Sequence, residues 1–267
     1  MASARAGVHL KPTARQASAR LRALANPTDA AFLQGFFKTG PGQYGHGDRF
    51  LGIRVPATRR VAREFRDLPL AGVTTLLSSR WHEERLLALL ILGGRYARGG
   101  ETERERIYRL YLANTSRINN WDLVDVSAPH VVGAHLATRS RAPLDRLAQS
   151  GSVWERRIAI VATHWFILRR GEIATTLCIA GALLDDPHDL IHKATGWMLR
   201  EAAKRDRPGV EQFLVAHQTE MPRTMLRYAI ERFSAATRKQ YLAGTARTSM
   251  GASARRAPAL NPALDFE

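Results

Sequence analysis

The stretch WERRIAIVATHWFI, residues 154–167, decides the fold class of this chain. Its apolar side chains recur three and four residues apart, as at Trp154, Ile158, Val161 and Trp165, which is the spacing of one face of an α-helix. Segments with the same spacing fill most of the sequence, and glycines and prolines divide them into pieces of helical length. The alternation of apolar and polar residues that indicates β-strands is nearly absent. The sequence therefore predicts an all-α protein.

Five of the expected helices share a second feature, which is a charged residue beside a run of apolar residues. The five charged residues lie 32 to 40 positions apart, and they are Arg85, Asp125, Arg157, Lys193 and Arg227. Another helical segment lies between successive members, so the repeating unit is a pair of antiparallel helices. Helix pairs at this period are typical of an α-solenoid of the HEAT or armadillo type, whose inner helices line a concave groove. We expect the five residues to form one row in a basic groove; the alternative is that they are unrelated charges at helix ends.

The charge of the chain indicates the kind of partner. Forty Lys and Arg stand against 24 Asp and Glu, which gives a formal charge of +16 over 267 residues. We expect a basic, flexible arm over residues 1–25, a helical domain over residues 26–243 and a flexible tail over residues 244–267. Because the two ends account for only part of the excess, the folded domain should present a positive surface. Such a surface favours a polyanion as the partner.

Composition also excludes several classes of protein. With 45% apolar residues, the chain is too hydrophobic to be disordered throughout. Its apolar runs are too short to cross a bilayer. The single cysteine, Cys178, stands in an apolar run that we expect to be buried, and it indicates a reducing, cytoplasmic location. An organellar transit peptide at the basic start is the alternative. The sequence has no nucleotide-binding glycine loop and no convincing set of metal ligands, so we expect no cofactor and no metal.

The segment NNWDLVDVSAP, residues 119–129, places a carboxylate at a break in the helical array. Trp121 and Asp125 are four residues apart and share a helix face. Pro129 lacks an N–H and cannot bond the carbonyl of Asp125, which predicts that the helix bends or ends there. A negative charge weakens anion binding in a basic groove, so its presence suggests a chemical role. The alternative is a structural salt bridge between Asp125 and Arg157.

Several longer stretches resemble the DNA alkylation repair family of HEAT-like glycosylases, the AlkD type. They are KTGPGQYGHGDRFLGIRVP, NNWDLVDVSAP, WERRIAIVATHWFI, DPHDLIHKATGWMLRE and MPRTMLRYAIERF, and the resemblance covers roughly residues 30–235. It implies an enzyme that hydrolyses the N-glycosidic bond of N3- and N7-alkylated purines in double-stranded DNA, and we expect a monomer. The resemblance makes Asp125, which closes the W-D-x-V-D stretch, the catalytic carboxylate.

The same resemblance implies residues that contact the DNA. Trp121 and Trp197 supply aromatic walls beside the deoxyribose. Arg157 stands where the family has an arginine next to the reaction centre, and we expect it to hold a backbone phosphate. Lys193 shares a helix face with Trp197, four residues away. We therefore expect these side chains to gather around Asp125.

We expect two further residues to contact the DNA, and for each of them the sequence also allows an interpretation without DNA contact. Arg85 either reaches a phosphate or belongs, with Glu83 and Glu84, to a solvated helix start. Tyr44 lies in the glycine-rich loop of residues 40–48 and either replaces an aromatic side chain that some relatives carry near Leu51 or is an ordinary exposed tyrosine.

The chemistry of the expected substrate agrees with this set of residues. Alkylation at N3 or N7 makes the purine cationic, so it leaves as a neutral base without help from a general acid. A carboxylate stabilises the oxocarbenium sugar and orients the water that attacks it. Two other functions remain open, namely a non-catalytic binder of DNA with unusual backbone structure and a protein-interaction scaffold. The net charge disfavours the scaffold, and Asp125 between Trp121 and Arg157 disfavours the inert binder.

Overall fold

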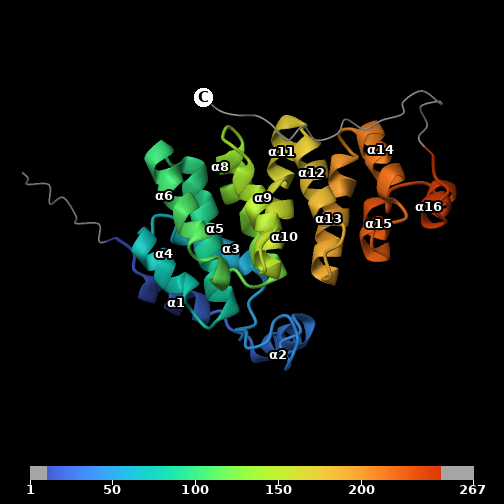
Figure 1. The fold of residues 1–267 in the computed structure, drawn as a ribbon. Coiled ribbons are helices and arrows are strands. Elements are labelled where there is room, and N and C mark those ends of the chain that lie inside the picture. The colour runs from blue at the N-terminus through green and yellow to red at the C-terminus, as the bar shows by residue number, and fades with distance from the viewer. Residues whose placement is uncertain (1–10, 248–267) are drawn as a thin grey trace, which may run out of the picture.

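The computed structural model describes residues 11–247, and the regular elements of that part are all helical (Figure 1). The first half contains α1 (Ala14–Arg22), α2 (Pro27–Phe36), α3 (Val55–Glu64), α4 (Leu70–Leu77), α5 (His82–Arg98), α6 (Glu101–Leu112) and the short 3₁₀ turn η1 (Thr115–Arg117). The second half contains α7 (Trp121–Ala128), the π-helical turn η2 (Pro129–Gly133), α8 (Ala134–Leu136), α9 (Ala142–Ala148), α10 (Val153–Ala162), α11 (His164–Arg170), α12 (Ala174–Ala182), α13 (Asp189–Ala202), α14 (Arg207–His217), α15 (Arg223–Ala229) and α16 (Ala235–Leu242). The all-α prediction is confirmed.

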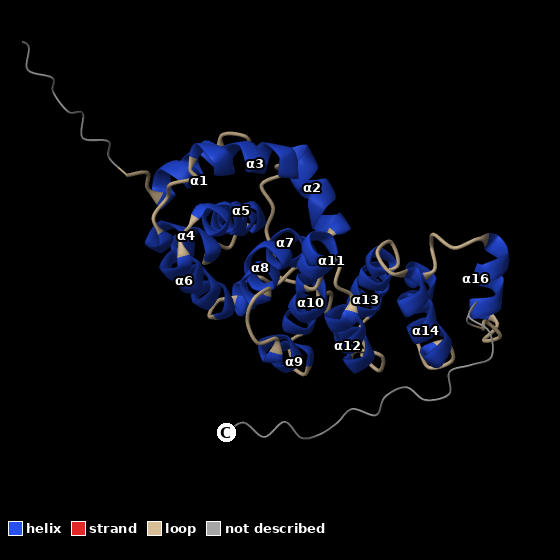
Figure 2. Ribbon diagram, turned by 90° about the horizontal axis from the view of Figure 1, so that it is seen from above, coloured by secondary structure: helices blue, strands red, loops and turns tan. Residues whose placement is uncertain are grey.

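Helices α1 and α3 to α6 form one end of the molecule, α7 to α13 follow them, and α14 to α16 form the other end (Figures 1 and 2). Helix α2 lies apart from α1 and α3, below the middle of the stack in Figure 1. Helices α5, α7, α10, α13 and α15 pack against one another in succession, and these are the helices that carry the five repeating charged residues. Helices α9 and α12 pack against α10 and α13 from the other side. The predicted α-solenoid is therefore confirmed.

Helix α1 corrects the expected boundary of the N-terminal arm. Thr13 and Gln16 form a capping box at its start, and Ala17 and Leu21, four residues apart, are fully buried. Residues 14–22 are thus part of the folded domain, because their apolar stripe packs on α3 and α4. Residues 1–10 of the expected arm and residues 248–267 of the expected tail lie outside the described residues.

The interruption at Pro129 occurs slightly later than the sequence suggested. Helix α7 continues to Ala128, three residues beyond Asp125, and the π-helical turn η2 then begins at Pro129. At the end of this turn, a Cβ atom on Gly133 would lie 2.2 Å from the carbonyl oxygen of Ala162. A residue without a side chain is therefore needed for η2 to pack against the end of α10.

Two further expectations concern the burial of Cys178 and the length of the apolar helices. Cys178 was expected to be buried, but its side chain is exposed on α12. In the described part of the chain, none of the helices combines the length and the apolar character that a membrane span needs.

Candidate active site

A cleft of about 740 Å³ opens beside α7, α10 and α13, with the end of α2 and the loop after it on its other side. Six of the seven residues expected at the DNA line it, and Arg85 does not. The lining residues are Phe36, Lys38, Tyr44, Trp121, Asp125, Arg157, His188, Asp189, Leu190, Lys193, Trp197, Arg200 and Tyr228. Residues of α7, α10 and α13, three of the helices that the repeat spacing relates, therefore lie together in the cleft.

Asp125 and Arg157 form a bidentate ion pair at the base of this cleft. Arg157 donates from Nε to Oδ1 of Asp125 at 2.9 Å, from Nη2 to Oδ2 at 2.8 Å, and from Nη1 to the carbonyl of Leu190 at 2.6 Å. The Asp125 side chain is 18% exposed and that of Arg157 is 6% exposed. Three of the five N–H donors of Arg157 therefore have acceptors, and the ion pair that the sequence offered as the alternative is present. A phosphate contact by Arg157 stays a prediction.

The environment of Asp125 sets its proton affinity. Burial raises the pKa of the Asp125 carboxyl, and the neighbouring Arg157 guanidinium opposes this effect without cancelling it. Asp125 lines the cleft, and both of its carboxylate oxygens accept hydrogen bonds from Arg157. Asp125 is thus a positioned carboxylate with a pKa above that of a free aspartate.

Aromatic side chains surround one end of the cleft. Trp121 stacks on Phe37 with ring centroids 5.2 Å apart, and Phe36 meets it edge-on at 6.1 Å. The Trp121 indole donates from Nε1 to the hydroxyl of Tyr44 at 3.3 Å. Tyr44 therefore lies on the cleft rather than on an unattached loop. Phe36 was not predicted from the sequence. The signal that could have found it is the pair Phe32 and Phe36, which are four residues apart and so share a face of α2.

Lys193 and Trp197 belong to α13, and both line the cleft. Lys193 pairs with Asp189 at 2.7 Å, and this partner raises the pKa of Lys193. The ring of Trp197 lies 5.5 Å from that of His164 on α11. Between the two residues, a Cβ on Gly196 would come within 2.4 Å of the carbonyl of Met225, so this glycine allows α13 to lie close against α15. The K-A-T-G-W stretch thus combines a cleft face with a helix-packing face.

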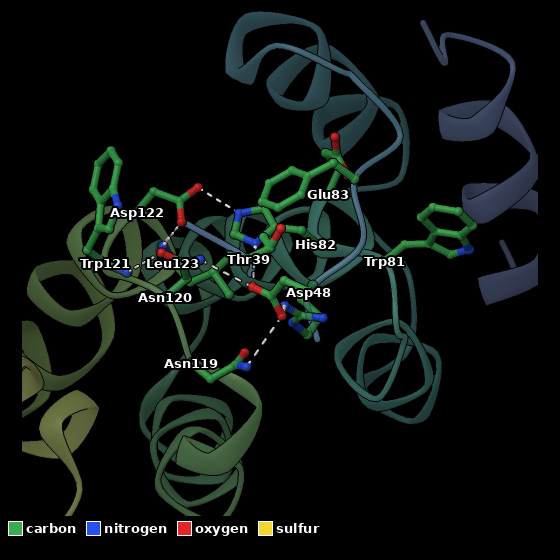
Figure 3. A network of polar contacts seen from close by, with 12 residues as sticks. Thr39, Asp48, Trp81, His82, Glu83, Asn119, Asn120, Trp121, Asp122 and Leu123 are labelled. Carbon is green, nitrogen blue, oxygen red and sulfur yellow. Dashed lines mark hydrogen bonds and ion pairs between the residues drawn. The ribbon is translucent and has the colours of Figure 1, made fainter. Parts of the chain in front are cut away.

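Arg85 corrects the expected row of groove residues. It is 4% exposed and donates from Nη2 to Oδ1 of Asp48 at 2.6 Å, so it is not available to DNA. Asp48 also accepts from Asn120 and lies 3.4 Å from Nδ1 of His82, whose Nε2 lies 2.8 Å from Oδ2 of Asp122 (Figure 3). Burial lowers the pKa of His82, but Asp122 and Asp48 outweigh burial and raise it to about 9. The start of α5 is therefore a buried polar cluster directly behind α7.

Glu83 and Glu84 are also buried, which corrects the expectation of a solvated helix start. The Glu83 carboxylate accepts from the backbone N–H groups of Leu51 at 2.9 Å, Gly52 at 2.9 Å and Ile53 at 3.1 Å. Gly52 has φ of +80°, and its Cβ would meet the carbonyl of Asn26 at 2.0 Å. Glu83 thus fixes the loop that leads away from Tyr44, and so holds one rim of the cleft in place.

The fold and the cleft together define a class of protein: a helical-repeat solenoid whose inner helices line a cleft that contains Asp125 and several aromatic side chains. The sequence profile described as "DNA alkylation repair enzyme" matches residues 17–233, and the chain belongs to this family. Among solved structures, it resembles a predicted DNA alkylation repair enzyme from Enterococcus faecalis, with a TM-score of 0.61 and 17% identity over 79% of this chain and 97% of that one. A comparison with curated proteins finds no match.

Proposed function

We propose that this protein is a monofunctional DNA glycosylase that hydrolyses the N-glycosidic bond of cationic N3- and N7-alkylated purines in double-stranded DNA, acting as a monomer. The observation that carries the proposal is the position of Asp125. Its carboxylate is fixed by Arg157 and lines the same cleft as Trp121 and Trp197. The family supports a role in DNA repair.

Asp125 acts on the sugar rather than on the base. As the cationic purine leaves, positive charge develops at C1′ and the ring oxygen of the deoxyribose, and a preorganised carboxylate stabilises that charge. The same oxygen atoms orient a water molecule toward C1′. Because Arg157 holds both carboxylate oxygens, little reorganisation is needed during the reaction. Arg157 is thus a positioning residue, acting through Asp125.

The aromatic residues support the same transition state. The side chains of Trp121, Trp197 and Phe36 line the cleft, and an aromatic face attracts a cationic group by about 0.5–2 kcal/mol. Tyr44 fixes the Trp121 indole through its hydroxyl. Lys193 stays protonated beside Asp189, which suits contact with a phosphate.

One observation favours the non-catalytic alternative, a DNA binder without chemistry. The bidentate pair between Asp125 and Arg157 neutralises the carboxylate, as a purely structural salt bridge does. The distinguishing experiment is incubation of the full chain with duplex DNA that contains N7-methylguanine, followed by chromatography of the free base. Release by the wild type and loss of release in Asp125→Asn support the glycosylase; no release by the wild type supports the inert binder.

A further inference from the structure

Most of the positive charges that line the cleft are compensated within the protein. Three of the four cationic side chains have a carboxylate partner, and the pairs are Arg157 with Asp125, Lys193 with Asp189, and Arg200 with Glu231. The fourth is Lys38, whose side chain is exposed and forms no ion pair with any residue that the structure describes. His188 also lines the cleft, but burial lowers its pKa, so it is neutral at neutral pH. Within the described chain, Lys38 is therefore the cation at the cleft that remains free to pair with an anion.

Lys38 also has an unusual backbone conformation. Among the described residues, it is the only one other than glycine with a positive φ, which is +52°. It follows Phe37, the C-cap of α2, and its N–H donates to the carbonyl of Gly35 at 3.1 Å. The N–H of Thr39 donates to the carbonyl of Gln34 at 3.3 Å, which completes a Schellman motif. Glycine is the usual residue at the position of Lys38 in this motif, because a Cβ atom disfavours the left-handed conformation.

The residues on both sides hold Lys38 in this conformation. Phe37 is 7% exposed and stacks on Trp121 with ring centroids 5.2 Å apart. On the other side, the carbonyl of Lys38 accepts from the N–H of Gly45 at 3.1 Å, and a Cβ atom on Gly45 would lie 2.4 Å from the carbonyl oxygen of Phe37. Packing around Phe37 and the loop that carries Tyr44 thus enforce a strained backbone at Lys38. Strain of this kind is concentrated at functional sites.

We propose that Lys38 binds one of the two phosphates that flank the target nucleotide, and that the chain keeps a strained lysine at the end of α2 for this contact. This inference rests on the proposed function, because it takes duplex DNA as the occupant of the cleft. Lys38 lines the same cleft as Asp125, which acts on the target sugar. The anionic groups nearest to that sugar are the two flanking phosphates. An ammonium group on a flexible stem binds phosphate as a point charge and needs no paired geometry.

A purely structural role is the alternative, because the helix dipole favours a positive charge near the C-terminal end of a helix. Three substitutions separate the two roles. Lys38→Gly removes both the charge and the strain, Lys38→Gln removes the charge and keeps a Cβ atom, and Lys38→Arg keeps both. Lys239 offers a matched control, because it is an exposed lysine in the last turn of α16, at the far end of the molecule, and does not line the cleft (Figure 1).

The test is equilibrium binding to a labelled duplex with a stable abasic analogue at its centre, measured by anisotropy over a series of salt concentrations. We expect Lys38→Gly and Lys38→Gln to weaken binding by about three- to tenfold and to flatten the slope of log K against log salt by about one, the value for one lost phosphate contact. Lys38→Arg and Lys239→Gln should bind within about twofold of the wild type.

Thermal melting of the same variants tests the strain. Lys38→Gly should melt about 2–4 °C above the wild type, because glycine adopts the left-handed conformation without cost. A variant that is more stable and yet binds DNA more weakly has lost a contact with the DNA and not its fold. A melting temperature below that of the wild type would overturn the claim that the lysine is kept at the expense of stability.

A second series of duplexes identifies the phosphate. Each of the two phosphates that flank the analogue is replaced in turn by an uncharged methylphosphonate. At one of these positions, the replacement should weaken binding by the wild type and leave binding by Lys38→Gln nearly unchanged. Three outcomes overturn the contact: wild-type binding by Lys38→Gln, equal weakening by Lys239→Gln, or additive effects of protein and DNA changes at both positions. Base release by the wild type is measured separately, so a failure of the proposed chemistry is distinguished from a failure of this contact.

Discussion

Nε2 of His82 lies 2.8 Å from Oδ2 of Asp122, and this buried contact joins the start of α5 to the start of α7. On its other edge His82 faces Asp48, and Phe50 stacks on its ring with centroids 4.5 Å apart. Asp122 is the residue after Trp121 and three before Asp125. The helix that carries two of the candidate site residues is therefore anchored from behind by a charged cluster that does not itself touch the cleft.

The first prediction concerns the pH dependence of stability. His82 has a pKa of about 9 in the folded protein, above the value of about 6.5 that an unfolded histidine has. Its protonation therefore stabilises the fold fully below about pH 6.5, and this contribution is lost as the pH rises to about 9. We expect the free energy of unfolding to fall over that window in the wild type and to fall less steeply in His82→Gln. Urea titrations at several pH values measure both slopes, and equal slopes would contradict a protonated His82.

The sequence predicted some parts of the structure and not others, because its signals act over different distances along the chain. Helices, their pairing and the gathering of Asp125, Trp121 and Trp197 depend on local periodicity and on a repeat, both of which are visible in one sequence. The partner of Arg85 is Asp48, 37 positions away in an irregular loop. No period relates a loop to a helix start, so Glu83, Glu84 and Arg85 looked solvated although they are buried. Phe36 was missed for the same reason, since its neighbours across the cleft come from α7 and the loop.

Replacement of the proposed catalytic carboxylate is the second prediction. Asp125→Asn keeps the size of the side chain but removes the negative charge that stabilises the oxocarbenium sugar. We expect the rate of base release to fall at least about a hundredfold, as when one preorganised electrostatic group is lost. DNA affinity should be kept or should rise, because a repulsive charge is gone. Single-turnover release from an N7-methylguanine duplex and a parallel binding titration measure the two effects, and wild-type release by the variant would remove Asp125 from the mechanism.

The third prediction concerns Arg157, which pairs with Asp125 instead of standing free. Burial already raises the pKa of Asp125, and Arg157→Ala removes the charge that opposes this shift. Since the ionised carboxylate is the active form, loss of base release toward low pH should begin at a higher pH in the variant. Arg157→Lys, which keeps the charge but not the bidentate geometry, should shift the acid limb less. The salt dependence of DNA binding should stay as in the wild type; a slope flattened by about one unit would show that Arg157 leaves Asp125 and holds a phosphate.

The fourth prediction tests the packing that supports Trp197. A methyl group at Gly196 would lie 2.4 Å from the carbonyl of Met225 and 2.5 Å from Cβ of Tyr228, so α15 must move away from α13. We expect Gly196→Ala to destabilise the fold by about 1–3 kcal/mol, the usual cost of overpacking. Gly100→Ala is the control, because nothing lies within 4 Å of the Cβ it would add. Chemical denaturation of both variants measures the difference, and equal stability would mean that α15 moves without strain.

The last prediction concerns substrate choice. The side chains at the cleft supply a carboxylate, aromatic faces and cations, and the catalysis proposed for them includes no protonation of the leaving base. A purine that already carries a positive charge needs no such protonation, so N3-methyladenine and N7-methylguanine should be released. Uracil, hypoxanthine and 8-oxoguanine, which are neutral, should remain in otherwise identical duplexes. Free base is measured by chromatography for the matched set, and uracil release at a rate comparable to that of N7-methylguanine would refute the mechanism.

The same assay tests whether the strand is cut. Lys193 carries an amine on the cleft, but Asp189 at 2.7 Å raises the pKa of Lys193 and keeps it as an ammonium ion, which has no lone pair with which to attack C1′. We therefore expect base release to leave an intact strand with an abasic site, which breaks only after alkali treatment. Borohydride should trap no covalent complex between the protein and the DNA. Strand cleavage before alkali, together with a trapped complex that Lys193→Gln abolishes, would instead make Lys193 the nucleophile of a bifunctional enzyme.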